Sequence, residues 1–233
     1  MSRSPLDFHV TWLGQMEFQR ALALQEGIVL QKHENCSVKD RLLLLEHEPV
    51  YTIGRTPDWS SLSAAGGIRR EPGDAHLPHP LFVINRGGQA TYHGPGQLIG
   101  YPIIDLRRCG QDLHKYLRWL EQLLIDLLAE HGIDGARRES FTGVWVGNRK
   151  IASVGVGVRR WITMHGFALN VCGDLSPFDH IVPCGINNVE MTSIEKETGN
   201  AASVRAVAAS VERLARDYIN DLRLIRAAQS IQV

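Results

Sequence analysis

The sequence contains no segment that could span a membrane, since no apolar run in its 233 residues approaches the ~20 residues that a helical span needs. The amino terminus also lacks the apolar core of a secretory signal, which favours a cytoplasmic protein. The formal net charge is zero, since Lys+Arg and Asp+Glu each number 25. This balance argues against a nucleic-acid-binding protein, whose binding is driven by neutralisation of phosphates. We therefore expect a protein that binds neither a membrane nor a nucleic acid.

Cysteine is scarce, and the cysteines are not spaced in pairs along the sequence. The four cysteines form no C-x-x-C motif, so neither a zinc knuckle nor a disulfide framework is expected. The phosphate-binding pattern G-x-x-x-x-G-K-[ST] is also absent. We therefore expect neither a metal nor a cofactor.

Glycine, in contrast, is concentrated in one segment, which runs from Arg86 to Gln97 and reads RGGQATYHGPGQ. The flanking apolar runs, Leu81–Ile84 and Leu98–Ile104, predict two buried strands. Ordering so many glycines costs conformational entropy, whereas their small size lets a ligand approach the backbone. Because the segment leads into a strand and not into a helix N-terminus, a phosphate site is disfavoured, and the segment predicts a binding site of another kind.

Elsewhere in the sequence, segments with the hydrophobic period of a helix alternate with segments typical of strands. Apolar spacing predicts helices over 17–32, 112–131 and 203–222, with Asp112 as an N-cap and Gly132 as a stop. Strands are expected over 42–45, 143–146, 151–158 and 164–171, with a hairpin turn at Gly147-Asn148. Residues 54–80 are typical of a mobile loop. The expected fold is α+β (mixed α/β), a central mixed sheet flanked by helices in a single domain, 1–233.

Cys184 is the cysteine with the most suggestive context. It lies in the irregular stretch Ile181-Val182-Pro183-Cys184-Gly185-Ile186, where Pro183 stiffens the backbone. Gly185 has no side chain to shield the thiol, and its N–H is placed to face an oxyanion. The residues leave two readings open, a reactive nucleophile and an inert buried thiol.

Lys150 follows the Gly147-Asn148 turn at the start of an apolar strand. A lysine in such a position is most often solvated. However, the neighbouring Arg149 and a partly apolar setting would both favour the neutral amine, which can exchange protons near neutral pH. Together with a reactive Cys184, such a lysine would suit acyl transfer.

At this point the sequence resembles a known family, the lipoyl(octanoyl) transferases, which are similar in fold to the catalytic domains of lipoate- and biotin-protein ligases. The resemblance is clearest over about residues 40–195. Its motifs are EHEPVYTIGR (46–55), RGGQATYHGPGQLIGYPIIDL (86–106), KIASVG (150–155), HGFALN (165–170), PCGI (183–186) and MTSI (191–194). The sequence departs from the family pattern at Glu48 and in the long loop over 56–80.

The resemblance implies a role for each motif. By position, Cys184 is expected to be the acyl-accepting nucleophile, and Lys150 the group that lowers the pKa of the thiol and shuttles protons. The acyl-binding residues are expected to be Arg86, Gly87, Gly88, Gln89, Ala90, Thr91, Tyr92, His93, Ser153, Val154, Gly155, Gly166, Phe167 and Ala168.

The implied reaction is transfer of an octanoyl or lipoyl group from acyl carrier protein to a lysine of a lipoyl domain, through a thioester on Cys184. The implied acceptors are the lipoyl domains of 2-oxoacid dehydrogenases and the glycine-cleavage H protein, and a monomeric enzyme is expected. Two alternatives remain: an ATP-dependent lipoate- or biotin-protein ligase, and a non-catalytic module that binds lipoyl domains or acyl carriers.

The size of the acyl chain limits what binding alone can achieve. An eight-carbon chain buries about seven CH₂ or CH₃ groups, which gives a gross ~5 kcal/mol at ~0.8 kcal/mol per group. This is enough to position a chain but not to reject one that is a carbon or two longer. Selectivity for chain length therefore requires a pocket with a closed end.

Overall fold

A large twisted sheet forms the centre of the computed structural model, which describes residues 8–62, 77–185 and 189–229. Its strands lie side by side in the order β1-β2-β6-β10-β9-β8-β7, and β11 pairs with β9. Their bounds are β1 Phe8–Met16, β2 Asp40–His47, β6 Gln97–Ile103, β7 Ala136–Arg138, β8 Phe141–Val146, β9 Arg149–Arg159, β10 Ile162–Asn170 and β11 Glu190–Met191. The β1–β2 and β11–β9 pairs are parallel and the others antiparallel, so the sheet is mixed, as expected.

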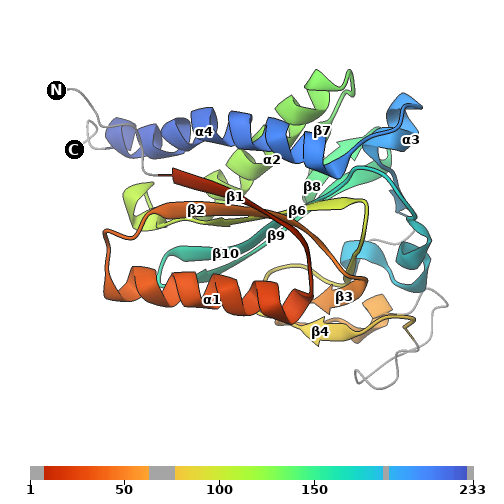
Figure 1. Cartoon of the computed structure of the whole chain (residues 1–233), viewed down its shortest axis with the longest axis horizontal. Coiled ribbons are helices and arrows are strands. Elements are labelled where there is room, and N and C mark those ends of the chain that lie inside the picture. Colours follow the sequence, from red (N-terminus) through yellow and green to blue (C-terminus); the bar gives the residue numbers. More distant parts are fainter. Residues whose placement is uncertain (1–7, 63–76, 186–188, 230–233) are drawn as a thin grey trace.

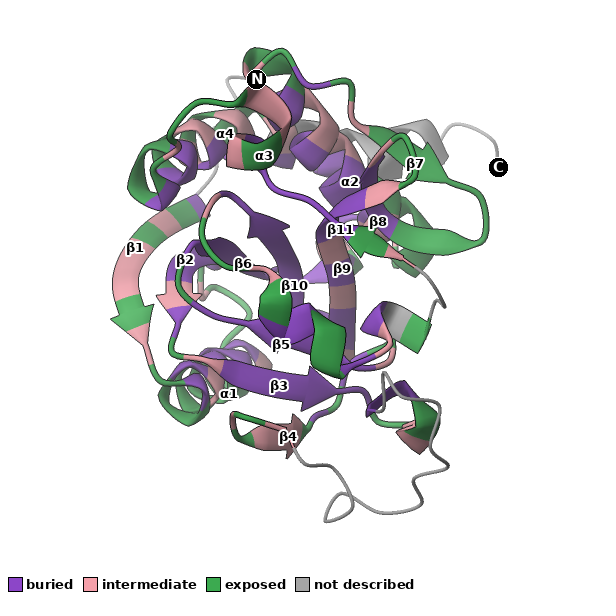
Figure 2. Ribbon diagram, turned by 90° about the vertical axis from the view of Figure 1, so that its right-hand side faces the viewer, coloured by how far each residue is buried: buried purple, intermediate pink, exposed green. Residues whose placement is uncertain are grey.

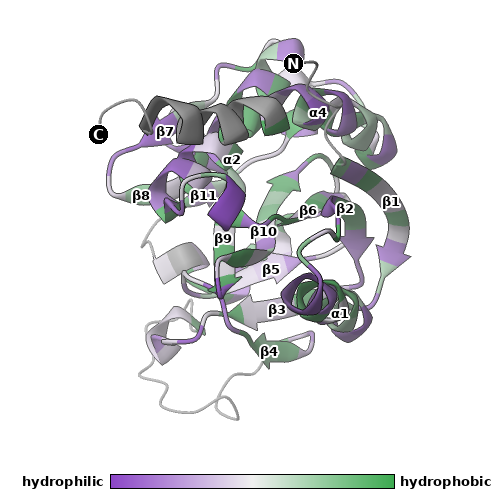
Figure 3. Ribbon diagram, turned by 90° about the vertical axis from the view of Figure 1, so that its left-hand side faces the viewer, coloured by the Kyte–Doolittle hydropathy of each residue, from purple (hydrophilic) through white to green (hydrophobic). Residues whose placement is uncertain are grey.

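Helices cover the two faces of this sheet (Figure 1). Helices α2 (Leu113–Glu130) and α4 (Val204–Gln229) pack together on one face, and α1 (Phe18–Glu34) lies on the other. Hydrophobic residues lie mainly along the strands and the inner helix faces, with hydrophilic residues on the outer turns (Figure 3). A short helix, α3 (Ile194–Thr198), follows β11.

A second, smaller sheet lies on the same side as α1. Its order is β4-β3-β5, from β3 (Val50–Ile53), β4 (Leu81–Val83) and β5 (Thr91–His93). Strands β3 and β5 are buried throughout, whereas β4 is not (Figure 2). The space between the two sheets is where the candidate site lies.

The local turn and cap signals were predicted correctly. The Asp112 carboxylate accepts a hydrogen bond from the backbone N–H of Lys115 at 3.0 Å and so caps α2. Gly132, after the helix, has φ +71°, and Gly147 and Asn148 turn β8 into β9.

Three expectations need correction. The Leu81–Ile84 run was predicted as a buried strand, but β4 is an edge strand in which Val83 is 51% exposed. The segment from Arg86 to Gln97 is not a continuous loop, because β5 forms within it. The last helix continues beyond residue 222 to Gln229. Of the expected loop over 54–80, residues 59–62 form a 3-10 helix (η1), and 63–76 lie outside the described residues.

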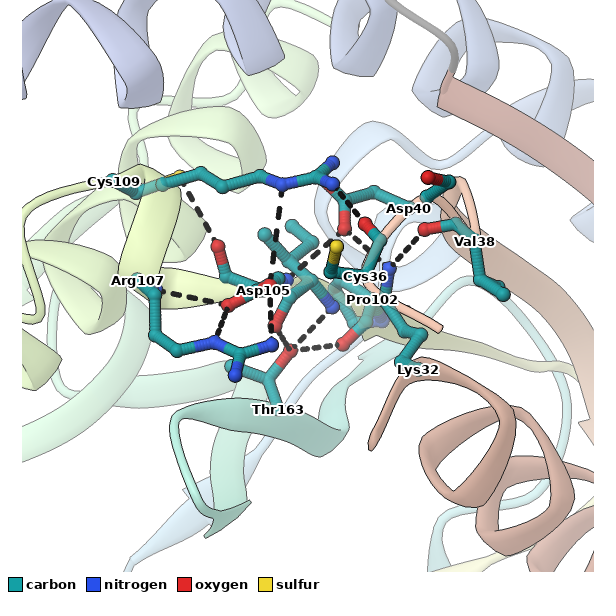
Figure 4. Close-up of polar contacts among 12 residues, drawn as sticks. Lys32, Cys36, Val38, Asp40, Pro102, Asp105, Arg107, Cys109 and Thr163 are labelled. Carbon is teal, nitrogen blue, oxygen red and sulfur yellow. Dashed lines mark hydrogen bonds and ion pairs between the residues drawn. The ribbon is translucent and has the colours of Figure 1, made fainter. Parts of the chain in front are cut away.

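A buried ion pair anchors the end of α1 to the sheet. The Lys32 ammonium lies 2.8 Å from the Asp40 carboxylate, and both side chains are almost fully buried. Lys32 also donates to the Val38 carbonyl, and Asp40 accepts from the backbone N–H of Asp105 (Figure 4). Because each charge has a partner and further hydrogen bonds, the cluster can stay buried at the turn after β6.

No helix in the described part of the chain is long and apolar enough to cross a membrane.

Candidate active site

A cavity lies between the two sheets. Its floor is formed by β9 and β10 of the large sheet, and its roof by β5 and the segment before it. The lining residues are Phe18, Ile84, Arg86, Gly87, Gly88, Thr91, His93, Tyr101, Ser153, Val154, Gly155, His165, Gly166, Phe167 and Ala168. Its walls are mostly apolar, as is typical of sites that hold small ligands.

Most of the acyl-binding residues expected from the sequence meet in this cavity. Three do not line it: Gln89, Ala90 and Tyr92. Successive residues of a strand point to opposite faces, so when Thr91 and His93 of β5 face the cavity, Tyr92 faces away. Tyr92 packs against Tyr51 and Phe178, with ring centroids 5.3 and 5.6 Å apart.

Four lining residues were not predicted: Phe18, Ile84, Tyr101 and His165. They come from α1, the end of β4, β6 and β10. Tyr101 and His165 belong to motifs that carry the family resemblance, which is the only signal that pointed to them. Phe18 and Ile84 read from the sequence as ordinary core residues.

The glycine-rich segment is held against the small sheet by very close backbone contact at Gly54. A Cβ atom on Gly54 would overlap the Gly88 carbonyl oxygen and lie 2.8 Å from that of Arg86. Only glycine therefore allows the two segments to lie this close. This explains why a glycine follows β3, in a motif far from the cavity in sequence.

Arg86 ties this segment to β3. Its guanidinium donates to the Thr52 carbonyl and hydroxyl oxygens, both at 2.9 Å, and to the carbonyl oxygens of Gly87 and Gln89 at 2.9 and 3.1 Å. The side chain is buried, so these hydrogen bonds replace water around the charge. Arg86 thus fixes the shape of the cavity wall.

A second set of buried hydrogen bonds continues from β5 towards β9. The Gln97 side chain bonds His93 Nδ1 at 2.8 Å and donates to Asn170 Oδ1 at 2.9 Å. Asn170 donates to the Thr192 carbonyl at 3.0 Å, and the Thr192 N–H donates to the Lys150 carbonyl at 3.0 Å. A chain of polar contacts therefore connects the cavity roof to the backbone of the candidate catalytic lysine.

The histidines around the cavity are held neutral. Burial lowers the pKa of His93 to about 3, with further contributions from the nearby His47 and Arg86. Burial also lowers the pKa of His47 to about 4, and burial with the Arg86 charge lowers that of His165 to about 4. His47 bonds the Tyr101 hydroxyl at 2.7 Å, and burial raises the pKa of Tyr101. These histidines therefore add no charge to the cavity at neutral pH.

Lys150 is buried, contrary to the usual reading of a lysine after a turn. Its Nζ lies 5.3 Å from the centre of the Trp145 ring, a cation–π distance. The lysine stem passes close to Gly143, where a Cβ atom would lie 2.9 Å from Lys150 Cε. The Gly143 N–H donates to the buried carboxylate of Glu121 at 3.0 Å.

Arg149, which precedes Lys150, pairs with an acidic residue. Its guanidinium forms a salt bridge with Glu197 at 2.8 Å, and Glu197 also accepts from the Thr192 hydroxyl. Because neighbouring strand residues point to opposite faces, Arg149 and Lys150 diverge. The Arg149 charge is thus compensated away from the cavity.

Lys150 opens onto a second hollow, which is also lined by the exposed residues Arg55 and Phe141. This hollow and the first cavity share the lining residues Gly87, Gly88, Val154 and Gly155. The lysine therefore lies next to one end of the cavity, where these four residues meet.

Cys184 belongs to a 3-10 turn, η5 (Pro183–Gly185), and its side chain lies outside the described residues. The turn lies against Gln89, since a Cβ atom on Gly185 would be 3.1 Å from Gln89 Cγ. The Gly185 N–H donates to the Val182 carbonyl at 3.0 Å. In this structure the N–H is therefore engaged within the turn, and its role as an oxyanion donor stays a prediction from the sequence.

Comparison with known proteins places the chain clearly. The model of the lipoyl protein ligase A/B catalytic domain matches residues 17–214. The octanoyltransferase of Geobacter sulfurreducens is 48% identical over 199 residues, 85% of this chain and 79% of its own. That of Geotalea uraniireducens is 44% identical over 218 residues, 93% of this chain and 95% of its own.

Solved structures share the fold at low identity. A bipartite lipoate protein ligase of Thermoplasma acidophilum has a TM-score of 0.63 at 14% identity, covering 92% of this chain and 84% of its own. Biotin protein ligase from Aquifex aeolicus has a TM-score of 0.52 at 13% identity, covering 92% and 70%. The expected likeness in fold to these catalytic domains is confirmed.

Proposed function

The chain belongs to the octanoyltransferases, within the lipoyl protein ligase A/B catalytic family, and we propose that it transfers an octanoyl group from acyl carrier protein to a lysine of a lipoyl domain. The acceptors are lipoyl domains of 2-oxoacid dehydrogenases and the glycine-cleavage H protein. The chain acts as a single catalytic domain. The observation that carries the proposal is the mostly apolar cavity between the sheets, one end of which adjoins Lys150.

The first half-reaction moves the acyl group onto the enzyme. Lys150 takes the proton of the Cys184 thiol, and the thiolate attacks the thioester carbonyl of the donor. The bond between the carbonyl carbon and the carrier sulfur breaks, and Lys150 returns the proton to the departing thiolate. One thioester replaces another, so no ATP is consumed.

The second half-reaction forms the amide. The amine of the acceptor lysine attacks the acyl-Cys184 carbonyl, and Lys150 takes a proton from the attacking nitrogen. The carbon–sulfur bond breaks, and the Cys184 thiolate regains its proton from Lys150. The enzyme therefore ends each cycle in its starting protonation state.

Proton transfer is the larger part of the role of Lys150. Lowering the thiol pKa by ~2 units raises the thiolate fraction roughly 25-fold. If the Brønsted slope of thiol exchange applies, intrinsic nucleophilicity falls by nearly tenfold, and the net gain is about threefold. Most of the effect of the lysine should therefore fall on protons that move to and from leaving groups.

The donor-only reaction tests the nucleophile. Intact-mass measurement after mixing with octanoyl-acyl carrier protein should show one octanoyl adduct, which peptide mapping places on Cys184. The Cys184→Ala variant should form no adduct. Cys36→Ala is the matched control, because Cys36 is an exposed thiol and its removal should leave the adduct intact. Full turnover by Cys184→Ala would overturn the covalent scheme.

Lys150 is tested by its effect on both half-reactions. Lys150→Ala should slow acylation of the enzyme by its donor and transfer from the isolated acyl-enzyme to a lipoyl domain. Lys150→Arg keeps a positive charge but cannot exchange a proton near neutral pH, so it should be as slow. Unchanged rates across the pH range would remove the assigned role.

Activity with free octanoate and ATP, and none with the thioester donor, would instead identify an ATP-dependent ligase. Stoichiometric binding of the carrier without acyl transfer would identify a binding module.

A further inference from the structure

The cavity between the sheets has two boundaries with other hollows. At one boundary, Gly87, Gly88, Val154 and Gly155 also line the hollow that holds Lys150. At the other, Ile84 and His165 also line a separate hollow, whose lining includes exposed residues such as Glu26 and Val83. The three spaces therefore follow one another, with the acyl cavity in the middle.

This order gives the bound acyl chain a direction. Its carbonyl carbon must lie at the Lys150 end, where bonds are made. Its methyl end then points along the floor from β9 across β10 towards β6, because Gly155, Gly166 and Tyr101 line the cavity in turn. Two strand spacings, about 9.5 Å, separate β9 from β6. This span is comparable with an extended eight-carbon chain.

Two residues around the methyl end, Phe18 and Tyr101, contact other side chains on the side away from the cavity. Phe18 stacks on Phe82 and packs edge-on against His47, with ring centroids 5.3 Å apart in both pairs. Tyr101 is held by its hydrogen bond to His47. Truncating either residue would leave a void closed off by these neighbours.

Ile84 differs because empty space lies behind it. The cavity beyond it is lined by Leu22, Val29 and Val83, together with polar residues such as Glu26 and Arg159. His165, the other shared residue, is fixed by a 2.8 Å hydrogen bond from its backbone N–H to Gln25 Oε1. Ile84 is the apolar side chain of the two shared residues, and its loss would join the two spaces directly.

We infer that Ile84, next to His165, forms the closed end of the acyl pocket and sets the longest chain that the enzyme accepts. The inference rests on the proposed function, since it assigns the specificity of the same site. With Ile84 in place, a chain longer than octanoyl must displace a buried isoleucine. Without it, the extra carbons can extend into the second cavity.

The test is a chain-length profile for Ile84→Ala. Transfer to a lipoyl domain is measured with octanoyl, decanoyl and dodecanoyl thioesters of acyl carrier protein. The dodecanoyl-to-octanoyl ratio of kcat/KM should rise by at least about tenfold relative to wild type. Ile84→Phe, which fills more of the pocket end, should lower transfer of octanoyl more than that of hexanoyl.

Val83→Ala is the matched control. Val83 is the adjacent residue, and it lines only the second cavity, so its truncation should leave the profile unchanged. If Ile84→Ala does not fold, Ile84→Val removes one methyl group and should raise the decanoyl-to-octanoyl ratio. Calorimetric binding of octanoate and dodecanoate provides a second readout independent of turnover.

The two possible failures are distinguishable. If wild-type protein transfers no acyl group from any thioester, the proposed function fails. If wild type transfers octanoyl and folded Ile84 variants keep its profile, the function stands and the pocket end has been assigned wrongly.

Discussion

Replacing Gly143 with alanine should displace the Lys150 side chain without substituting either residue that is proposed to react. Gly143 has φ +123°, a conformation that side-chain-bearing residues rarely adopt. Its missing Cβ leaves room for the Lys150 stem on one side and the Ala152 carbonyl on the other. Gly143→Ala therefore combines backbone strain with a direct collision at the lysine.

The geometry sets the size of the effect. The new methyl carbon would lie 2.9 Å from Lys150 Cε, whereas carbon atoms pack at about 3.5–4.0 Å. The lysine stem must therefore move by about 0.6–1 Å. A misplacement of about 1 Å can cost about 100-fold in rate. Strain at the backbone adds about 1–3 kcal/mol to the cost in unfolding free energy.

Gly147→Ala separates strain from collision. Gly147 also has positive φ (+57°), in the adjacent hairpin turn, but a Cβ atom added there would meet no other atom within 4 Å. The variant should lose about 1–2 kcal/mol of stability and keep its activity. Both half-reactions are measured by stopped flow at a temperature where circular dichroism shows each variant to be folded. A folded Gly143→Ala enzyme as active as Gly147→Ala would refute the reasoning.

Two further predictions concern the buried polar groups. His47, His93 and His165 have pKa values lowered to about 4, 3 and 4, so between pH 6.5 and 4 the unfolded chain binds protons that the folded chain does not. The contribution of the neutral histidines to the unfolding free energy should therefore be complete above pH 6.5. Below that pH the unfolding free energy should fall by about 1.4 kcal/mol per histidine for each pH unit. Equal midpoints of urea unfolding at pH 7.5 and pH 5 would contradict this prediction. Gln97→Leu removes a hydrogen-bond partner of His93 and of Asn170, so the unfolding free energy should fall by about 2–5 kcal/mol. The control is Gln122→Leu, which should change the unfolding free energy by less than about 1 kcal/mol.

The sequence was most informative where structure is decided locally. The Asp112 cap, the Gly132 stop and the Gly147-Asn148 hairpin each depend on a few adjacent residues, and each was predicted correctly. The strand Thr91–His93 was missed because the glycines around it mask its short apolar–polar alternation. Its pairing with β3 is a contact between segments about 40 residues apart, which no local pattern encodes.

The candidate site was predictable only in part, because some of its contacts join segments that are far apart in the sequence. Motif resemblance identified most of the cavity lining, but not that Tyr92 faces away from it or that Phe18 and Ile84 belong to it. The burial of Lys150 was also unexpected, since it follows a turn. It is covered by β11, which pairs with Lys150 through Met191, and by Trp145 from β8. Both partners lie outside the motif that contains the lysine.

The polar residues around the cavity form hydrogen bonds with other groups of the protein. Arg86 and His93 would each be costly beside an alkyl chain, yet each has polar partners within the protein, Gln97 among those of His93. A ligand with polar groups along its length would have to compete with those bonds, whereas an alkyl chain leaves them intact. We therefore expect selectivity to depend on the shape of the cavity at the proposed closed end and on Lys150 at the other end.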